Sequence, residues 1–296
     1  MTRQNYYRRL DKFLRRNLPE VSLSALYKFI RKGKVYVNGK RVKDQAFELQ
    51  IGDEVAIRYV DIEKFKRRKE SELLPQKMDL DIVYEDESIL VLNKPAGIAL
   101  HPGKNIHVAT LIEGLMYYGN EKSFEPHLVH RLDLNTSGVL VVAKTKEASR
   151  ILTDAFKRRI VSKEYIALVR GELPEFGTID EKLDGQEALT TYRLLEYRAD
   201  LSMVKVAIKT GRKHQIRRHF SMIGHHVAGD NKYGDKTFNR ELRRKTGLRR
   251  QFLHCYTLSL PEGLFSKEMK FKAPLPEDLK KVLKVLGFRY LNSCQG

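Results

Sequence analysis

The chain has 296 residues and carries 56 Lys and Arg against 37 Asp and Glu, which gives a formal net charge of +19. A positive surplus of this size favours a polyanionic partner, and nucleic acid fits better than a lipid surface because the charge is spread along the chain. Two cysteines are too few for a disulfide framework and fit a reducing compartment. The apolar runs fall well short of the roughly 20 residues of a membrane-spanning helix, and the basic N-terminus lacks the apolar core of a secretory signal. We therefore expect a cytoplasmic protein that binds nucleic acid and makes no membrane contact.

The first 60 residues are expected to form two helices followed by strands. The apolar residues of 10–18 fall on one helical face, and a second helix is expected to begin at the N-cap candidate Ser22 and to end at Gly33. Residues 35–37 read as a strand and lead into Asn38-Gly39, the strongest short signal for a β-hairpin.

This N-terminal unit is basic. Residues 1–60 contain 14 Lys and Arg and 6 Asp and Glu, so 14 − 6 gives +8. Two helices, a glycine stop and a Val-x-Val-Asn-Gly-Lys hairpin resemble the S4 RNA-binding module. The resemblance implies that the second helix and the loop after it offer cations to RNA phosphates, here Lys28, Arg31, Lys32, Lys34, Lys40, Arg41 and Lys43. The alternative is a solvated charged face, which the single sign of the charge disfavours.

The rest of the chain is expected to hold a linker and a second domain. Residues 63–78 are polar and charged, with a proline near the end, which is typical of a linker. Beyond them, strand-like runs begin at residues 82, 89, 139, 165, 191 and 203, whereas helical patterns are fewer and cover mainly 148–158 and 214–223. We predict an α+β protein with a small S4-like α/β domain at 1–62, a linker at 63–78, and a larger domain at 79–296 built on a mixed, mainly antiparallel sheet.

The most informative stretch is His130-Arg131-Leu132-Asp133-Leu134-Asn135-Thr136-Ser137-Gly138, which runs directly into the apolar strand pattern of residues 139–143. Loops at strand ends often carry functional side chains. On chemistry alone, however, an adjacent Arg and Asp form a surface or structural ion pair more often than a catalytic group. The residue types by themselves therefore favour a structural role for Asp133.

These nine residues match the His-Arg-Leu-Asp-x-x-Thr-Ser-Gly signature of the RluA family of RNA pseudouridine synthases at every fixed position. The chain resembles this family over residues 82–280. Further landmarks follow in family order: Asn93-Lys94-Pro95-Ala96-Gly97, Lys163-Glu164-Tyr165, Thr210-Gly211-Arg212-Lys213-His214-Gln215-Ile216-Arg217, Gly229-Asp230 with Lys232-Tyr233-Gly234, and Leu253-His254-Cys255. The resemblance implies a pseudouridine synthase fold for residues 79–296, and isomerisation of uridine in RNA as the activity.

The resemblance also implies the site residues. It makes Asp133 the nucleophile, which attacks either the base or the sugar. A carboxylate in a pocket dry enough to hold a base tends to take up a proton, so a cation is needed to keep it charged, and the family assigns that task to Arg217. Tyr165 becomes the aromatic that stacks on the target uracil, and Arg131 fills the gap that the turned-out nucleotide leaves. Without the resemblance, Arg217 would pass for a surface cation and Tyr165 for a core residue.

Isomerisation breaks the glycosidic bond, turns the uracil and rejoins it through carbon 5, so we expect neither a cofactor nor a metal. The sequence contains no Gly-x-Gly-x-x-Gly and no Walker loop, and its His and Cys spacings match no common zinc pattern. We expect a monomer that acts on 23S ribosomal RNA or its precursor, with transfer RNA as the alternative, and expect the Arg-rich tract 240–250 to gather RNA phosphates. We also expect Arg217→Ala to lose turnover while folding is kept. The competing hypotheses are a non-catalytic RNA-binding or ribosome-assembly protein on the same scaffold and, less favoured, an S4-linked methyltransferase.

Overall fold

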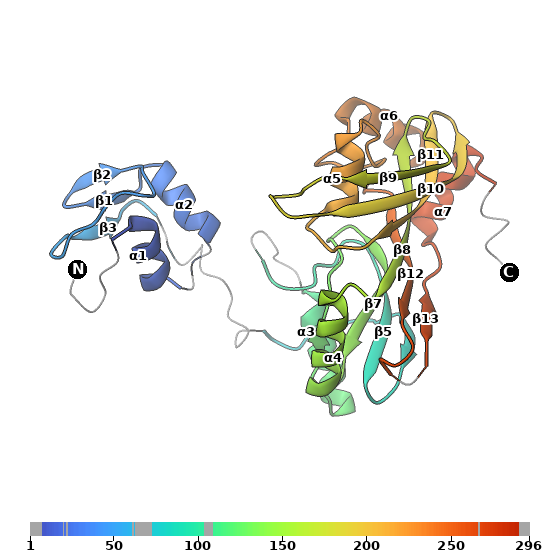
Figure 1. Ribbon diagram of the computed structural model, residues 1–296, viewed down its shortest axis with the longest axis horizontal. Coiled ribbons are helices and arrows are strands. Elements are labelled where there is room, and N and C mark those ends of the chain that lie inside the picture. The colour runs from blue at the N-terminus through green and yellow to red at the C-terminus, as the bar shows by residue number, and fades with distance from the viewer. Residues whose placement is uncertain are drawn as a thin grey trace. The chain divides into compact units, whose positions relative to one another are not determined.

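The computed structural model describes residues 8–19, 21, 23–60, 62, 73–103, 109–265 and 267–289. The chain divides into two compact units (Figure 1): the described residues up to 74 belong to the first, and residues 75–101 and 109–289 to the second. The domain boundaries expected at residues 62 and 79 remain a proposal, because most of the expected linker lies outside the described residues. The N-cap candidate Ser22 also lies outside them.

The N-terminal unit packs two helices against a small sheet. Helices α1 (Leu10–Asn17) and α2 (Leu23–Arg31) precede strands β1 (Val35–Val37), β2 (Lys40–Val42) and β3 (Val55–Ile57), which pair antiparallel in the order β2-β1-β3. Asn38 and Gly39 have φ of 49° and 75°, the left-handed conformations that a tight hairpin turn needs. Gly33, with φ of 63°, follows the end of α2. The predicted helix pair and hairpin are confirmed.

The C-terminal unit is built on one ten-stranded sheet. Its strands are β4 (Ile82–Glu85), β5 (Ile89–Lys94), β6 (His127–Leu128), β7 (Ser137–Ala143), β8 (Ser162–Arg170), β9 (Phe176–Asp180), β10 (Leu189–Arg198), β11 (Leu201–Ile208), β12 (Leu253–Leu260) and β13 (Met269–Lys272). The main order is β4-β5-β7-β12-β8-β11-β10-β9, with β13 paired to β12 and β6 to β7. Strands β7 and β12 run parallel and the other neighbouring pairs run antiparallel, which confirms the predicted mixed sheet.

Helices cover both faces of this sheet. They are α3 (Leu111–Lys122), α4 (Lys146–Lys157), α5 (Gln215–Met222), α6 (Lys236–Thr246) and α7 (Glu277–Leu286). One buried cluster joins α3, α4 and α5 to Ala167 and Val169 of β8, and a second joins α6 and α7 to Ile166 and Leu168. Because successive strand residues point to opposite faces, β8 is buried on both sides, and its apolar run is continuous rather than alternating.

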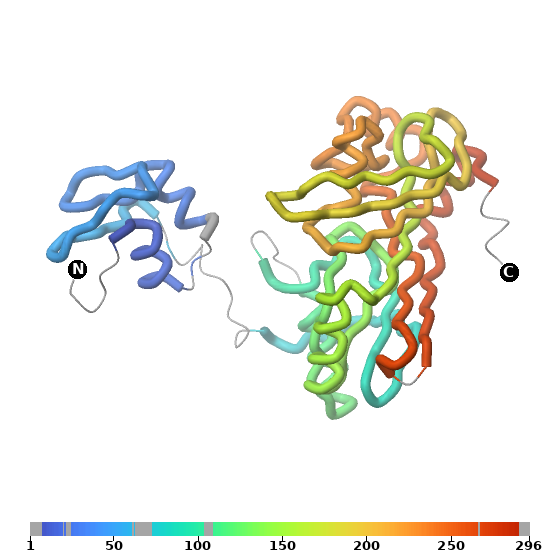
Figure 2. The backbone as a smooth tube through the Cα atoms, in the orientation of Figure 1, coloured from blue at the N-terminus to red at the C-terminus, as the bar shows by residue number. Residues whose placement is uncertain are grey.

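The two ends of the C-terminal unit meet in the sheet. Figure 2 shows the first strands of this unit, in cyan, next to its last strands, in red. There the rings of Tyr84 and Phe271 lie 5.3 Å apart. Strand β12 lies between β7 and β8. Residues from the middle and the end of the chain therefore meet at the sheet centre.

The structure contains more helix than the sequence pattern predicts. The pattern indicates α4 and α5, whereas the structure also contains α3, α6 and α7. Glycine disfavours a helix, yet α3 contains two, because a Cβ at Gly114 would press on Met78 and a Cβ at Gly119 on the Phe124 carbonyl. Tertiary packing therefore outweighs the local preference here.

Candidate active site

The His130 to Gly138 segment forms a loop that ends in β7 at the centre of the sheet. The Thr136 amide donates to the Asp133 carbonyl at 3.0 Å, which closes a turn with Asp133 at its start. Gly138 has φ of 115° and lies opposite Cys255 of β12, where a Cβ would collide with the Cys255 backbone carbonyl. The glycine thus lets β12 approach closely and fixes the loop that carries Asp133.

A buried polar network holds the far side of this loop. His254 Nε2–H donates to the Ala273 carbonyl at 3.0 Å, which leaves Nδ1 to accept from the Ser137 hydroxyl at 2.9 Å. Arg250 donates to Ser137 Oγ and the Asn135 carbonyl, both at 3.2 Å. The loop is therefore tied to β12 and β13 through side chains whose hydrogen-bonding roles are mutually consistent.

The environment of Arg250 differs from the one expected for residues 240–250. The Arg-rich tract 240–250 is expected to face RNA phosphates, but Arg250 is buried and forms a bidentate pair with Asp278 of α7, at 2.6 and 3.1 Å. A guanidinium fork satisfied by a carboxylate and two loop oxygens has no capacity left for a phosphate. Arg250 is a structural residue of the loop.

Acid is expected to weaken this network. Burial lowers the pKa of His254 from its ordinary value of 6.5 to about 4. Between these pH values the unfolded chain binds a proton that the folded chain does not, so the free energy of unfolding falls as the pH is lowered. The loss for this group is on the order of 3 kcal/mol once the pH lies below its folded pKa. Calorimetric unfolding from neutral pH downward measures it, and His254→Asn should give a shallower fall; equal slopes for both proteins would contradict the prediction.

Lys94 at the end of β5 and His130 at the start of the loop hold the loop in place. The fully buried Lys94 ammonium donates to the carbonyls of Pro95, Leu134 and Thr136 at 2.7 to 3.3 Å. Burial lowers its pKa to about 8, which leaves it charged at neutral pH. His130 Nε2 accepts from the Val141 amide at 2.8 Å, and burial lowers the pKa of this imidazole to about 3.

Arg217 of α5 joins two carboxylates from distant parts of the chain. Its Nη1 lies 3.0 Å from Asp133 Oδ2, and its Nε and Nη2 lie 2.6 and 2.9 Å from the two oxygens of Asp230. Burial acts to lower the pKa of Arg217, but the hydrogen bonds and charges of Asp230 and Asp133 outweigh it and hold the pKa above its ordinary value. Asp230 is fully buried and also accepts from the Lys232 and Tyr233 amides. Asp230 thus aims the remaining guanidinium edge at Asp133.

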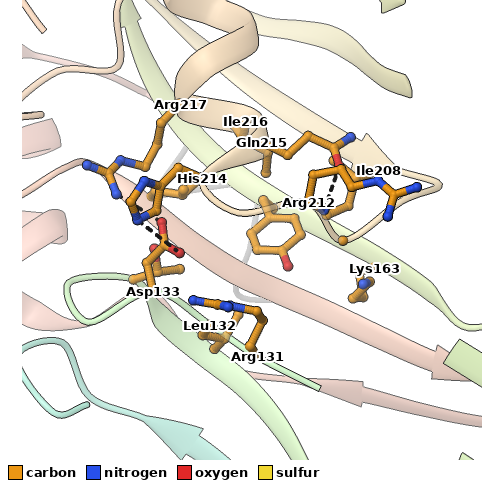
Figure 3. Close-up of a pocket in the computed structure, with 14 residues that line it drawn as sticks. Arg131, Leu132, Asp133, Lys163, Ile208, Arg212, His214, Gln215, Ile216 and Arg217 are labelled. Carbon is orange, nitrogen blue, oxygen red and sulfur yellow. Dashed lines mark hydrogen bonds and ion pairs between the residues drawn. The ribbon is translucent and has the colours of Figure 1, made fainter. Parts of the chain in front are cut away.

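His214 and Tyr233 form a second set of contacts on the side of Asp133 Oδ1. Figure 3 shows His214 beside Arg217, with both side chains directed at Asp133. His214 Nε2 lies 3.9 Å from Asp133 Oδ1, and its Nδ1 lies 2.9 Å from the Tyr233 hydroxyl. Burial lowers the pKa of His214 to about 4, so the imidazole is neutral at physiological pH. Its backbone φ of 55° is unusual for a residue other than glycine.

The pocket around Asp133 also contains the other two residues of the predicted catalytic set. Its lining includes Arg131, Tyr165 and Arg217, together with Lys163 and Leu253. Tyr165 is buried, and burial with the neighbouring Cys255 raises its pKa well above its ordinary value, so the phenol is protonated. Arg131 is exposed at the edge of the pocket. The structure therefore brings all four side chains to one pocket, while their catalytic roles remain predictions.

The residues expected to contact RNA in the N-terminal unit are mostly exposed. Arg31, Lys32, Lys40, Arg41 and Lys43 are exposed, and Lys34 is half-buried with its ammonium 5.4 Å from the centre of the Tyr59 ring. Arg41 and Arg58 lie over the Tyr36 ring, at 5.8 and 5.1 Å. Cations beside aromatic rings are a surface that RNA can use, although RNA contact by these residues remains a prediction.

The parts of the site that depend on long-range contact are not evident from the sequence. The family resemblance marks Asp230, Tyr233, His214 and Lys94 as landmarks but assigns them no role. Within the described ranges, no group of three His, Cys, Asp or Glu side chains is arranged to hold a metal ion. No helix in those ranges is long and apolar enough to cross a membrane.

Comparison with known proteins defines the class. Residues 88–222 match the RNA pseudouridylate synthase family and residues 8–55 match the S4 domain. Ribosomal large subunit pseudouridine synthase C of Escherichia coli strain K12 is 38% identical over 94% of this chain and 92% of its own length. The Bacillus subtilis protein described as uncharacterized RNA pseudouridine synthase YlyB is 34% identical over 94% of both chains. The solved human RNA pseudouridylate synthase domain containing 4 has a TM-score of 0.60 and 27% identity, covering 70% of this chain and 93% of that structure.

The matches and the mixed sheet together define an RNA pseudouridine synthase. Within that class, the chain belongs to the RluA family and carries an N-terminal S4 domain.

Proposed function

We propose that this enzyme converts uridines of large-subunit ribosomal RNA to pseudouridine, with Asp133 as its nucleophile. The name of the 38% identical relative, which aligns with 94% of the chain, supports the ribosomal target. The observation that carries the nucleophile is the Arg217 guanidinium 3.0 Å from the Asp133 carboxylate, in a pocket that Tyr165 also lines. An Asp pre-paired with a buried cation suits attack at neutral pH.

The proposed reaction begins when Asp133 attacks the turned-out nucleotide at the sugar or at the base. Arg217 bonds Oδ2, so Oδ1 is the oxygen available for the attack. The bond from the ribose C1′ to N1 breaks, the uracil turns, and a bond from C1′ to C5 forms. C5 loses its proton while N1 gains one, and Asp133 is released unchanged. Substrate and product have the same composition, so the proposal needs no cofactor.

Tyr165 and Arg131 act on the base and on the space it leaves. Tyr165, whose phenol is protonated, is buried in the pocket wall and supplies its flat apolar ring to the uracil. Arg131, which is exposed beside the nucleophile, fills the vacated position in the RNA stack. The basic side chains of the S4 unit add phosphate contacts, and we propose that the enzyme works as a monomer in the cytoplasm.

The proposed function is tested by mapping pseudouridines in 23S ribosomal RNA from cells that lack the gene. We expect specific sites to disappear, and to return with the wild-type gene but not with Asp133→Asn. A non-catalytic assembly factor would instead leave every site modified in the deletion strain or restore them all with Asp133→Asn. Loss of sites in transfer RNA alone would overturn the ribosomal target.

A further inference from the structure

A second hollow lies beside α6 and shares no lining residue with the Asp133 pocket. It encloses about 190 Å³ and is lined by Gly229, Asn231, Lys236, Asn239, Arg240, Arg243, Leu248 and Arg249. All four of its cationic side chains are exposed. The hollow therefore presents a concentrated positive charge to the solvent.

The local sequence explains why these cations converge. Asp235 caps α6 by accepting from the Thr237 and Phe238 amides, which fixes the start of the helix. Positions 236, 240 and 243 are then spaced by four and three residues, so their side chains share one helical face. Gly247, with φ of 80°, ends the helix, and Arg249, two residues later, lines the same hollow.

Among the described residues, the cations of the hollow have no acidic partner. Within the part of the chain that the structure describes, no ion pair involves Lys236, Arg240, Arg243 or Arg249. By contrast, Arg170, Arg218 and Arg250 of the same unit are each paired with a carboxylate. Like charges three and four residues apart destabilise a helix, so this arrangement works against folding and favours a bound anion that would relieve the repulsion.

The wall of the hollow is the turn that positions Arg217. Asn239 Oδ1 accepts from the Gly229 amide at 2.8 Å, and its Nδ2 donates to the Asp230 carbonyl at 3.0 Å. Gly229 has φ of 75°, and a Cβ there would collide with the Arg250 carbonyl, so the turn is closely packed. An anion in the hollow would therefore be held beside the segment whose Asp230 side chain bonds Arg217.

We propose that this hollow binds backbone phosphates of the RNA strand that carries the target uridine, chiefly through Arg240 and Arg243. The proposal rests on the RNA substrate of the proposed function. An arginine fork matches a phosphate in charge and geometry. Phosphate contacts fix the position of a strand and carry no sequence information, so the hollow governs affinity for RNA while the Asp133 pocket governs the reaction.

The test compares two double variants with the same change of charge. Arg240→Gln with Arg243→Gln removes two cations from the hollow, and Lys146→Gln with Arg150→Gln removes two exposed cations from α4. The probe is a fluorescein-labelled oligouridine, whose Kd is measured by anisotropy between about 50 and 200 mM salt. We expect the hollow variant to bind about tenfold more weakly at low salt and its salt slope to fall by about 1.4, since each lost phosphate contact of a single strand removes about 0.7. We expect the α4 variant to stay within about twofold of wild type.

Turnover on 23S RNA from the deletion strain gives the second readout. KM should rise with the affinity loss while kcat stays within about twofold, because the hollow makes the same contact before and during the reaction. Arg240→Lys with Arg243→Lys should keep most of the salt slope. Equal effects of the two Gln variants would show that the hollow acts only as general surface charge, which would contradict the proposal. An unchanged Kd of the hollow variant would refute the site. Because binding is measured without turnover, failure of the ribosomal target would leave this result interpretable.

Discussion

Asp133→Asn is expected to abolish pseudouridine formation, lowering kcat by at least about 10⁴-fold. The amide keeps the shape of the side chain but is a far weaker nucleophile. Arg217 keeps its bidentate contact with the buried Asp230, so the pocket should retain its structure. The rate is measured by release of tritium from carbon 5 of labelled 23S RNA. RNA affinity should be unchanged, since Asp133 makes no phosphate contact in the proposal.

The matched control is Asp184→Asn. Asp184 is likewise paired with an arginine, through a bidentate contact with Arg218, but its side chain is 77% exposed on the surface. The same chemical change there should leave both the rate and the stability close to wild type, because exposed ion pairs contribute little. If Asp133→Asn retained activity within about tenfold of wild type, Asp133 could not be the nucleophile.

The sequence predicts those features that depend on local pattern. Asn38-Gly39 fixes a hairpin through its own backbone preferences, and the apolar runs of the larger domain become strands of a buried sheet. The meeting of Asp133 with Arg217 was expected only through family resemblance. These residues lie 84 positions apart, and no periodicity places α5 over the loop that precedes β7.

Features that depend on long-range contact could not be predicted in this way. Arg250 stands in a run of arginines and reads as a surface cation, yet it is buried and paired with Asp278, 28 residues later. Neighbouring Arg249 remains exposed in the hollow beside α6. Charge in the sequence identifies both as cations, but only tertiary structure separates the structural residue from the candidate RNA contact.

Arg217→Ala is expected to remove turnover and to destabilise the fold at the same time. From the sequence alone we expect folding to be kept, but Asp230 is fully buried and depends on Arg217 for its charge partner. Removing one member of a buried ion pair costs about 3–5 kcal/mol, because the other charge is left uncompensated. The loss of kcat should be on the order of 10³-fold, since Asp133 also loses its guanidinium. Thermal unfolding and tritium release measure the two effects.

A double variant separates stability from catalysis. Arg217→Met with Asp230→Asn removes both buried charges, while the Asn side-chain oxygen can still accept from the Lys232 and Tyr233 amides that Asp230 Oδ1 now bonds. Neutralising both partners should recover most of the lost stability. Activity should stay lost, because no cation then faces Asp133. Recovery of turnover together with stability would show that Arg217 only supports the fold, and a single variant as stable as wild type would contradict the buried pair itself.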